Sequence, residues 1–241
     1  MIFALISTIV SVIFAAVVLN LYRTRHHGYT LAWGVALMMW VLAAAVEVVA
    51  ASSGWTVGLY RIYYLFGGIL LVGCFGLGTS LLLFARGGKV YLVLLAIATL
   101  AALWAVGTAP IDGRLLAHVT SVPPDAAMCG NLAHCPATSN LVATILAIVV
   151  NTIGTIFLVG GAIYSAVVFA IRKSQPRRVV SNVLIGIGAL VVASAATLTR
   201  FGQPDLFYLG QAMGLVVMFA GFVVASLPQV ATRQASALST N

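Results

Sequence analysis

Short polar stretches divide the chain into seven long apolar segments. A helix needs about 20 apolar residues to cross the ~30 Å hydrocarbon core of a bilayer. The segments that meet this requirement are residues 2–22, 31–51, 62–84, 90–108, 141–171, 179–199 and 206–227. The pattern predicts an all-α integral membrane protein, a single seven-transmembrane-helix bundle over residues 1–227 with a short tail, 228–241.

Composition agrees with lipid as the solvent of this chain. Of its 241 residues, 62% are hydrophobic and 7% are charged, whereas soluble domains carry roughly 25% charged residues. The first apolar segment has no basic residue before it and no evident small-residue cleavage site. We therefore expect a retained helix there rather than a secretory signal peptide.

The basic residues alternate along the chain in a way that predicts orientation. Nine of the 12 Lys and Arg residues lie in alternate connections and in the tail: Arg23, Arg25, Arg86, Lys89, Arg172, Lys173, Arg177, Arg178 and Arg233. Because cytoplasmic loops carry an excess of Lys and Arg, we expect the N-terminus outside and the C-terminus in the cytoplasm, in the plasma membrane. The net charge of +8 then reflects topology and attraction to anionic lipid, and nucleic acid is not an expected partner.

The longest connection, residues 109–140, contains two cysteines in the sequence CGNLAHC. Its expected location outside the cell is oxidising, so Cys129 and Cys135 are expected to form a disulfide, which stabilises the fold by about 2 kcal/mol. A metal site that adds His134 is the alternative. Zinc sites usually use closer cysteine pairs and four ligands, so no metal is expected. Cys74, within a predicted span, is expected to be a buried small hydrophobe.

Glu47 is the only acidic residue within a predicted span. It follows Leu31 by 16 residues, or about 24 Å along a helix, which places it in the outer part of the membrane. Ionisable residues inside a membrane are functional candidates by default. The alternative is a structural ion pair at the outer rim, for which Arg61 or Arg200 could supply the partner.

Aromatic and charged residues gather near the expected outer ends of several helices. One interpretation is the aromatic belt of the membrane interface. The other is an outward-facing pocket with aromatic walls and a few polar groups, which is typical of small-molecule sites. The candidate ligand-binding residues are Glu47, Trp55, Tyr60, Arg61, Tyr64, Arg200, Asp205 and Tyr208.

Small residues recur at a spacing of four within the predicted spans. Gly76-x3-Ser80 is echoed by Gly161-x3-Ser165, and Gly210-x3-Gly214 follows the same rule. Such spacing lets helices approach closely, either inside the bundle or against a partner subunit, and the sequence leaves both open. Asn151, Asn182 and Gln211 are expected to form interhelical hydrogen bonds.

The residues that several cofactors and enzyme classes require are missing from the expected positions in this chain. No histidine lies in a predicted span, so a haem between helices is not expected. The only lysines, Lys89 and Lys173, lie in connections, so no lysine is placed to bind retinal. Nucleotide-binding, metalloprotease and serine-hydrolase motifs are missing as well. We therefore expect no cofactor and no enzymatic activity.

The stretch WGVALMMWVLAAAVEVVAASSGW, followed by YRIYYLFGGILLVGCFGLGT, resembles the seven-helix N-terminal sensor region of some bacterial histidine kinases. Trp40, Glu47 and Tyr63–Tyr64 occupy the matching positions, within the first three predicted helices. The segment is also similar to uncharacterised bacterial membrane proteins with an R-x-Y-Y-L-x-G segment. Sensor kinases continue into an output domain, whereas this chain ends shortly after its last span. Signalling is therefore expected to pass through a partner.

Three functions are compatible with these features. A non-enzymatic sensor-like or accessory subunit, with an outward pocket or a partner-binding surface, fits the acidic residues near the outer side. A small-solute or ion transporter is the alternative, although transporters place polar groups on broken helices near the midplane. A membrane-embedded enzyme ranks third, since it would need clustered ionisable residues. The expected partners are the lipid bilayer and a membrane protein or a second copy of the chain.

The disulfide leads to a direct chemical test. Thiol labelling of the denatured protein without reductant should modify Cys74 at most, because oxidised Cys129 and Cys135 have no free thiol to react. Added reductant should expose both to the reagent. Labelling of Cys129 before reduction would show that the disulfide is absent.

Overall fold

The computed structural model describes residues 2–117, 126–129, 132–173, 175–200 and 205–226, without the side chains of residues 85, 117, 126, 198–200 and 205. These residues form helices and connections, with no strand among them. Seven helices among the described residues are long and apolar enough to cross a membrane. The predicted all-α, seven-span architecture of a multi-pass membrane protein is therefore confirmed.

Five spans are formed by α1 (Ile2–Arg25), α2 (Gly28–Ser53), α5 (Ala85–Thr108), α10 (Pro176–Arg200) and α11 (Asp205–Ser226). The other two are composite. One joins α3 (Val57–Tyr63), the π-helical segment η1 (Tyr64–Leu70) and α4 (Leu71–Leu83). The other joins α8 (Thr138–Thr155), the π-helical segment η3 (Ile156–Gly160) and α9 (Gly161–Ile171). Between α5 and α8 lie α6 (Gly113–Ala117), α7 (Ala126–Cys129) and the 3-10 turn η2 (Leu132–His134).

The helices extend beyond the predicted apolar segments. The second helix begins at Gly28 rather than at residue 31, and the third begins at Val57 rather than at residue 62. The fourth, fifth and sixth spans also begin three to five residues before their predicted starts. Hydropathy marks the part of a helix that contacts lipid, whereas backbone hydrogen bonding continues through the polar interface. The predicted boundaries were therefore too short at these N-terminal ends.

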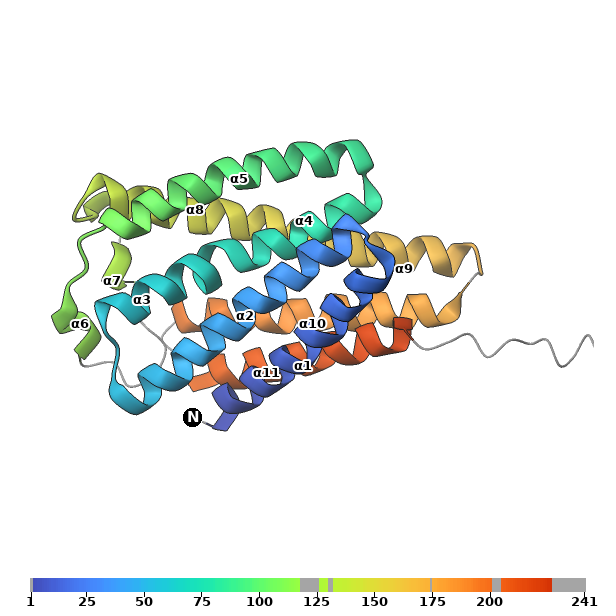
Figure 1. Cartoon of the computed structure of the whole chain (residues 1–241), viewed down its shortest axis with the longest axis horizontal. Coiled ribbons are helices and arrows are strands. Elements are labelled where there is room, and N and C mark those ends of the chain that lie inside the picture. The colour runs from blue at the N-terminus through green and yellow to red at the C-terminus, as the bar shows by residue number, and fades with distance from the viewer. Residues whose placement is uncertain (1, 118–125, 130–131, 174, 201–204, 227–241) are drawn as a thin grey trace, which may run out of the picture.

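The spans pack as a ring with one helix outside it. α1 contacts α2 and α11, α2 contacts α4, α4 contacts α8 and η3, and α10 closes the ring through α9 and α11. α5 packs outside this ring on α4 and α8, and it lies along one edge of the bundle in Figure 1. Many large apolar side chains face outward, such as Leu100 at 69% exposure and Ile171 at 76%. An outer surface of this kind suits lipid rather than water.

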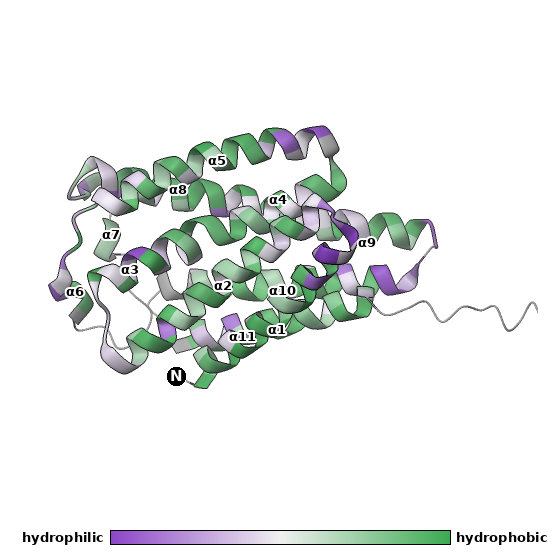
Figure 2. Ribbon diagram, viewed as in Figure 1, coloured by the Kyte–Doolittle hydropathy of each residue, from purple (hydrophilic) through white to green (hydrophobic). Residues whose placement is uncertain are grey.

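The two ends of the bundle differ in their charged residues. The basic end carries the connections from α1 to α2, from α4 to α5 and from α9 to α10, where Figure 2 shows hydrophilic positions gathered. The loop end carries the turn from α2 to α3 and the connection from α5 to α8. Cys129 and Cys135 at the loop end form the expected disulfide, with their Cα atoms 5.0 Å apart. Cys74 is buried and free, as predicted.

Small residues allow α4 and α8 to touch backbone to backbone. A Cβ atom added to Gly76 would lie 2.6 Å from the Cα atom of Gly154, and one added to Gly154 would overlap the carbonyl oxygen of Val72. On the other side of the ring, Gly210 packs on Ala195, and Gly214 packs on Gly188. These small-residue patterns therefore serve the interior of the bundle, which the sequence left undecided.

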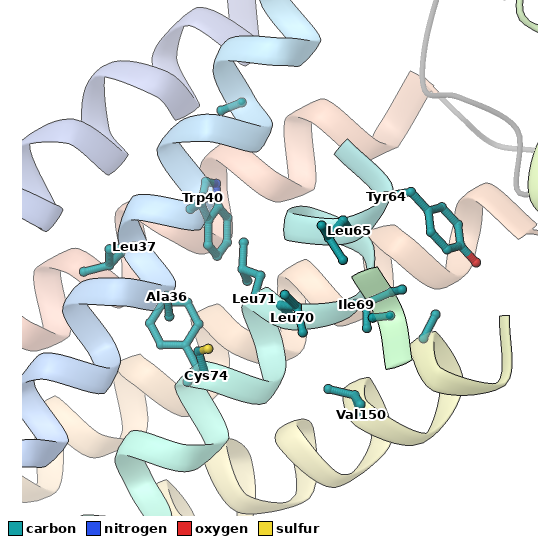
Figure 3. Close-up of a cluster of buried hydrophobic side chains, with 14 of the residues drawn as sticks. Ala36, Leu37, Trp40, Tyr64, Leu65, Ile69, Leu70, Leu71, Cys74 and Val150 are labelled. Atoms are coloured by element: carbon teal, nitrogen blue, oxygen red, sulfur yellow. The ribbon is translucent and has the colours of Figure 1, made fainter. Parts of the chain in front are cut away.

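The π-helical segment η1 depends on a side chain from the neighbouring span. A π-helical turn changes the local hydrogen-bond ladder, and other groups must then satisfy the displaced backbone. The Asn151 amide of α8 donates to the carbonyl oxygen of Gly68 in η1 at 2.6 Å and to that of Ala147 at 2.7 Å. Asn151 thus forms the interhelical hydrogen bond expected of it. Figure 3 shows Leu71, the first residue of α4, beside Trp40 of α2, with Leu65, Ile69 and Leu70 of η1 on its other side.

The close approach of α4 and α8 predicts a position-specific effect of a single methyl group. Gly154→Ala should lower the free energy of unfolding by about 1–3 kcal/mol, because its Cβ atom has no room against the α4 backbone. Gly160→Ala in the same span is the matched control, since a Cβ atom there meets nothing within 4 Å. Thermal unfolding in detergent measures both, and equal midpoints for the two variants would contradict the packing.

Candidate functional site

The turn between α2 and α3 brings a group of tyrosines back beside α2. α2 ends before Gly54, whose φ of 84° is a conformation that glycine adopts readily. Thr56 then caps α3, because its hydroxyl oxygen accepts a hydrogen bond from the Leu59 amide at 3.2 Å. The turn is short, so the first residues of α3 and η1 lie close to the last two turns of α2. Glu47 lies in this part of α2.

Glu47 is buried at the loop end of the ring, with a relative exposure of 1%. The side chains of Tyr63 and Gln211 reach its carboxyl group, and Tyr208 interacts with it electrostatically. These contacts are loose, because neither carboxyl oxygen has a hydrogen bond of standard geometry. Groups from α2, α3 and α11 therefore converge on one carboxyl. We call Glu47, Tyr63, Tyr208 and Gln211 the Glu47 cluster.

Other aromatic side chains pack at the same end of the bundle, and one of these contacts includes Tyr63 of the Glu47 cluster. Trp55 contacts Tyr63 edge to face, with ring centroids 5.5 Å apart, and Tyr60 contacts Tyr64 at 5.6 Å. Trp55, Tyr60 and Tyr64 are all buried. Figure 3 shows the hydroxyl group of Tyr64 directed away from the labelled apolar side chains. The Glu47 side chain is itself only 1% exposed, and the low polarity of such an interior strengthens any electrostatic interaction that its carboxyl makes.

Arg61 does not form the ion pair that was considered for it. Its guanidinium group donates to the carbonyl oxygen of Ala109 at 3.0 Å, so it binds the C-terminal end of α5 instead of Glu47. The interaction is favourable because a helix C-terminus carries a partial negative charge. Among the described side chains, no cation lies within ion-pair distance of Glu47. The side chains of Arg200 and Asp205, the other charged candidates, lie outside the described residues.

The structure places Tyr208 beside Glu47, and it places Trp55 against Tyr63. Tyr60 and Tyr64 contact each other at the same end of the bundle. Glu47, Trp55, Tyr60, Tyr64 and Tyr208 gather at the loop end, whereas neither of the cavities described for the chain is lined by any of them. The expected open outward pocket is a packed polar cluster in this structure.

Two members of the Glu47 cluster were missing from the predicted site. Tyr63 belongs to the same aromatic run as Tyr60 and Tyr64, but a run of tyrosines does not reveal which ring faces the carboxyl. Gln211 was expected only to bond between helices. Its 7% exposure, with a side-chain oxygen that has no hydrogen bond, marks it as part of the site. The sequence feature that could have identified Gln211 is its long polar side chain within an apolar span.

The Glu47 cluster combines acceptor oxygens of Glu47 and Gln211 with the hydroxyl groups of Tyr63 and Tyr208. An isolated carboxylate in an apolar interior is strongly unfavourable, so it requires a proton or a positively charged partner. No group of three or more His, Cys, Asp or Glu side chains in the described part of the chain could hold a metal ion.

No protein-family model, curated protein or solved structure matches this chain.

The position of Arg61 predicts a structural role that is separable from the Glu47 cluster. Arg61→Leu should lower the free energy of unfolding by about 1.5–3 kcal/mol, because it removes a charge-assisted hydrogen bond between α3 and the end of α5. Arg114→Leu, on an exposed residue of α6, should change it by less than about 0.5 kcal/mol. Chemical unfolding of both variants is the measurement, and an unaffected Arg61→Leu protein would exclude this role.

Proposed function

We propose that this protein is a non-enzymatic, sensor-like membrane protein in which the Glu47 cluster binds a small ligand that is positively charged or donates hydrogen bonds. The observation that carries the proposal is the Glu47 carboxyl itself. It is 1% exposed, and both of its oxygens lack a hydrogen bond of standard geometry. Buried polar groups are nearly always satisfied, so such an exception calls for an explanation.

Several acceptor atoms at this position favour a ligand over a purely structural role. The two Glu47 oxygens and the side-chain oxygen of Gln211 are all buried and without a hydrogen bond of standard geometry. A structural network tends to satisfy each of its members, since a partly satisfied one destabilises the fold. A small cation, or a ligand with N–H groups, would satisfy these acceptors and compensate the charge. The rings of Tyr63 and Tyr208 beside the carboxyl would favour a cation further.

The ligand is proposed to enter from outside the cell. The basic end of the bundle is the cytoplasmic end in this proposal, because positively charged loops remain inside. The Cys129–Cys135 disulfide at the opposite end supports the assignment, since disulfides persist in oxidising compartments. The Glu47 cluster lies at that disulfide-bearing end, within reach of an extracellular ligand.

A sensor role follows from where the cluster sits among the helices. Its members come from α2, α3 and α11, so an occupant would change how three spans pack against each other. Such a change shifts the balance between two arrangements of the bundle, to the extent that the ligand binds one of them more tightly. The resemblance to histidine-kinase sensor regions at Trp40, Glu47 and Tyr63–Tyr64 supports this interpretation. A membrane protein partner would receive the signal.

Transport of a small solute or ion is the second candidate. The observation in its favour is the pair of π-helical segments, η1 and η3, which interrupt two neighbouring spans. Interrupted helices are common at transporter sites, and π-helical turns are frequent at functional sites. Solute flux into proteoliposomes that requires both Glu47 and Asn151 would favour transport over sensing.

Glu47→Gln tests the ligand site while keeping the shape of the side chain. The purified protein is heated in sodium, potassium, ammonium, methylammonium or choline chloride at constant ionic strength. We expect one of these cations to raise the unfolding temperature of the native protein, because a ligand present at 100 times its Kd adds about 2.7 kcal/mol of stability. The Glu47→Gln protein should not respond, since it lacks the negative charge that attracts the cation.

Asp112→Asn is the matched control, because Asp112 is an exposed carboxylate at the same end of the bundle. It should keep the full response to the cation. An equal response of the native and Glu47→Gln proteins would place the site elsewhere. A Glu47→Gln protein with altered stability in every salt, and no cation response in the native protein, would assign Glu47 a structural role.

A further inference from the structure

A second site lies inside the ring, in its half nearer the basic end. A partly open cavity of about 60 Å³ is lined there by residues from α1, α2, α4, α9, α10 and α11, together with Leu158 of η3. Most of its wall is apolar, and Phe14, Phe75 and Met218 are among the residues that form it. None of the residues of the Glu47 cluster lines it. The cavity is therefore distinct from the ligand site proposed above.

The polar groups of the cavity gather on one side. Asn182 of α10 and Ser165 of α9 line it, and both are half-buried. The other two polar lining groups, Trp33 and Thr79, already donate to the carbonyl oxygen of Phe75, at 3.3 and 3.2 Å. Polarity is thus concentrated where α9 and α10 meet, and the rest of the wall remains hydrocarbon.

A row of residues leads from this polar side to the surface of the basic end. Arg178 precedes Asn182 by four residues on α10, and Phe169 follows Ser165 by four on α9, so each pair shares a helix face. Arg178 and Phe169, the members of these pairs nearer the surface, are in contact: the Arg178 guanidinium lies 5.5 Å from the centre of the Phe169 ring. An exposed cation, two neutral polar groups and an apolar cavity thus follow one another from the surface inward.

The size and lining of the cavity restrict what can fill it. A sphere the size of water needs about 10–15 Å³ of such volume, so a cavity of about 60 Å³ has room for roughly four to six groups of about that size. A cavity of about 150 Å³ accommodates benzene, so a rigid ring is too large for this one. Water needs two to four polar partners, so it suits only the side of the cavity that carries Asn182 and Ser165, and the remaining wall is apolar. A flexible hydrocarbon chain fits both the volume and the wall.

We propose that one phospholipid with an anionic head group binds here, with an acyl chain in the cavity and its phosphate at Arg178. Charge complementarity selects the head group, since Arg178 is exposed at the end of the bundle where the basic residues gather. Arginine binds phosphate oxygens with two parallel hydrogen bonds. Asn182 and Ser165 then face the ester groups between head group and chain. The bilayer itself supplies the ligand.

Native mass spectrometry can test the site on the whole protein. The protein is reconstituted in nanodiscs of equal amounts of phosphatidylglycerol and phosphatidylcholine with identical chains, and the lipids that remain bound after release are counted. We expect the native protein to keep one phospholipid and to favour phosphatidylglycerol about fivefold. One basic side chain near an anionic membrane surface contributes about 1 kcal/mol, which corresponds to that ratio. Arg178→Gln should reduce this preference to about one, as expected when that contribution is lost.

Two matched controls separate this site from general attraction to lipid. Arg86→Gln removes the same charge from α5, which does not line the cavity, and should keep the preference. Ser165→Leu fills the polar side of the cavity and should abolish lipid retention, whereas Ser194→Leu, on an exposed part of α10, should not. Asn182→Leu replaces Ser165→Leu if the latter does not give a monodisperse, helical protein.

Two results would overturn the proposal. Retention of lipid by folded Ser165→Leu and Asn182→Leu proteins at the native level would show that no chain occupies the cavity. An equal loss of preference in Arg86→Gln and Arg178→Gln would show that diffuse attraction, rather than a phosphate at Arg178, selects the lipid.

Discussion

The contact between the backbones of α4 and α8 is the constraint on which the rest of this bundle depends. In a membrane, lipid is as apolar as the side chains, so helices associate through close packing and interhelical hydrogen bonds. Gly76 and Gly154 remove the side chains from the contact, and Asn151 ties α8 to the displaced backbone of η1 at Gly68. Because η1 continues α3, this contact also holds the tyrosines of α3 and η1 beside α2. The position of the candidate site follows from it.

The interior of the ring combines two different environments along one axis. Glu47 of α2 and Gln211 of α11 contribute to the polar cluster at the loop end. Leu37 of α2 and Met218 of α11 line the apolar cavity toward the basic end. Gln211 and Met218 are seven residues apart, which places them near one helix face. The same two spans therefore contact both proposed sites. A change in the position of α2 relative to α11 at one end would therefore affect the other end.

The proposed sensor role needs only a ligand that favours one packing of the helices over another. The unsatisfied carboxyl stores an unfavourable interaction that a ligand can relieve, and differential binding to two packings is all that a switch requires. The lipid proposed for the cavity would fill a void that otherwise loses dispersion contacts. It would thereby stabilise the packing of α9, α10 and α11. Ligand and lipid would act on a common set of helices from opposite leaflets.

The sequence by itself determined the seven spans and the cysteine pair. Apolar length fixes a span because the bilayer has a fixed thickness, and two cysteines six residues apart with no nearer partner in the same connection pair with each other. It also marked Glu47, since an ionisable residue in an apolar segment stands out without any structure. Helix ends were less well determined, because hydropathy detects lipid contact rather than backbone hydrogen bonds.

Only the tertiary structure decided which groups meet. Nearly uniform apolar faces left the order of the helices open, so the pairing of Arg61 with Ala109 rather than Glu47 could not be foreseen. The same holds for Gln211, which joins Glu47 from a helix more than 160 residues away in the chain. The η1 segment and the cavity also depend on packing between distant spans. A hydrophobic pattern specifies the solvent of each segment, whereas the neighbours of each side chain are set by the shape of the surfaces that pack.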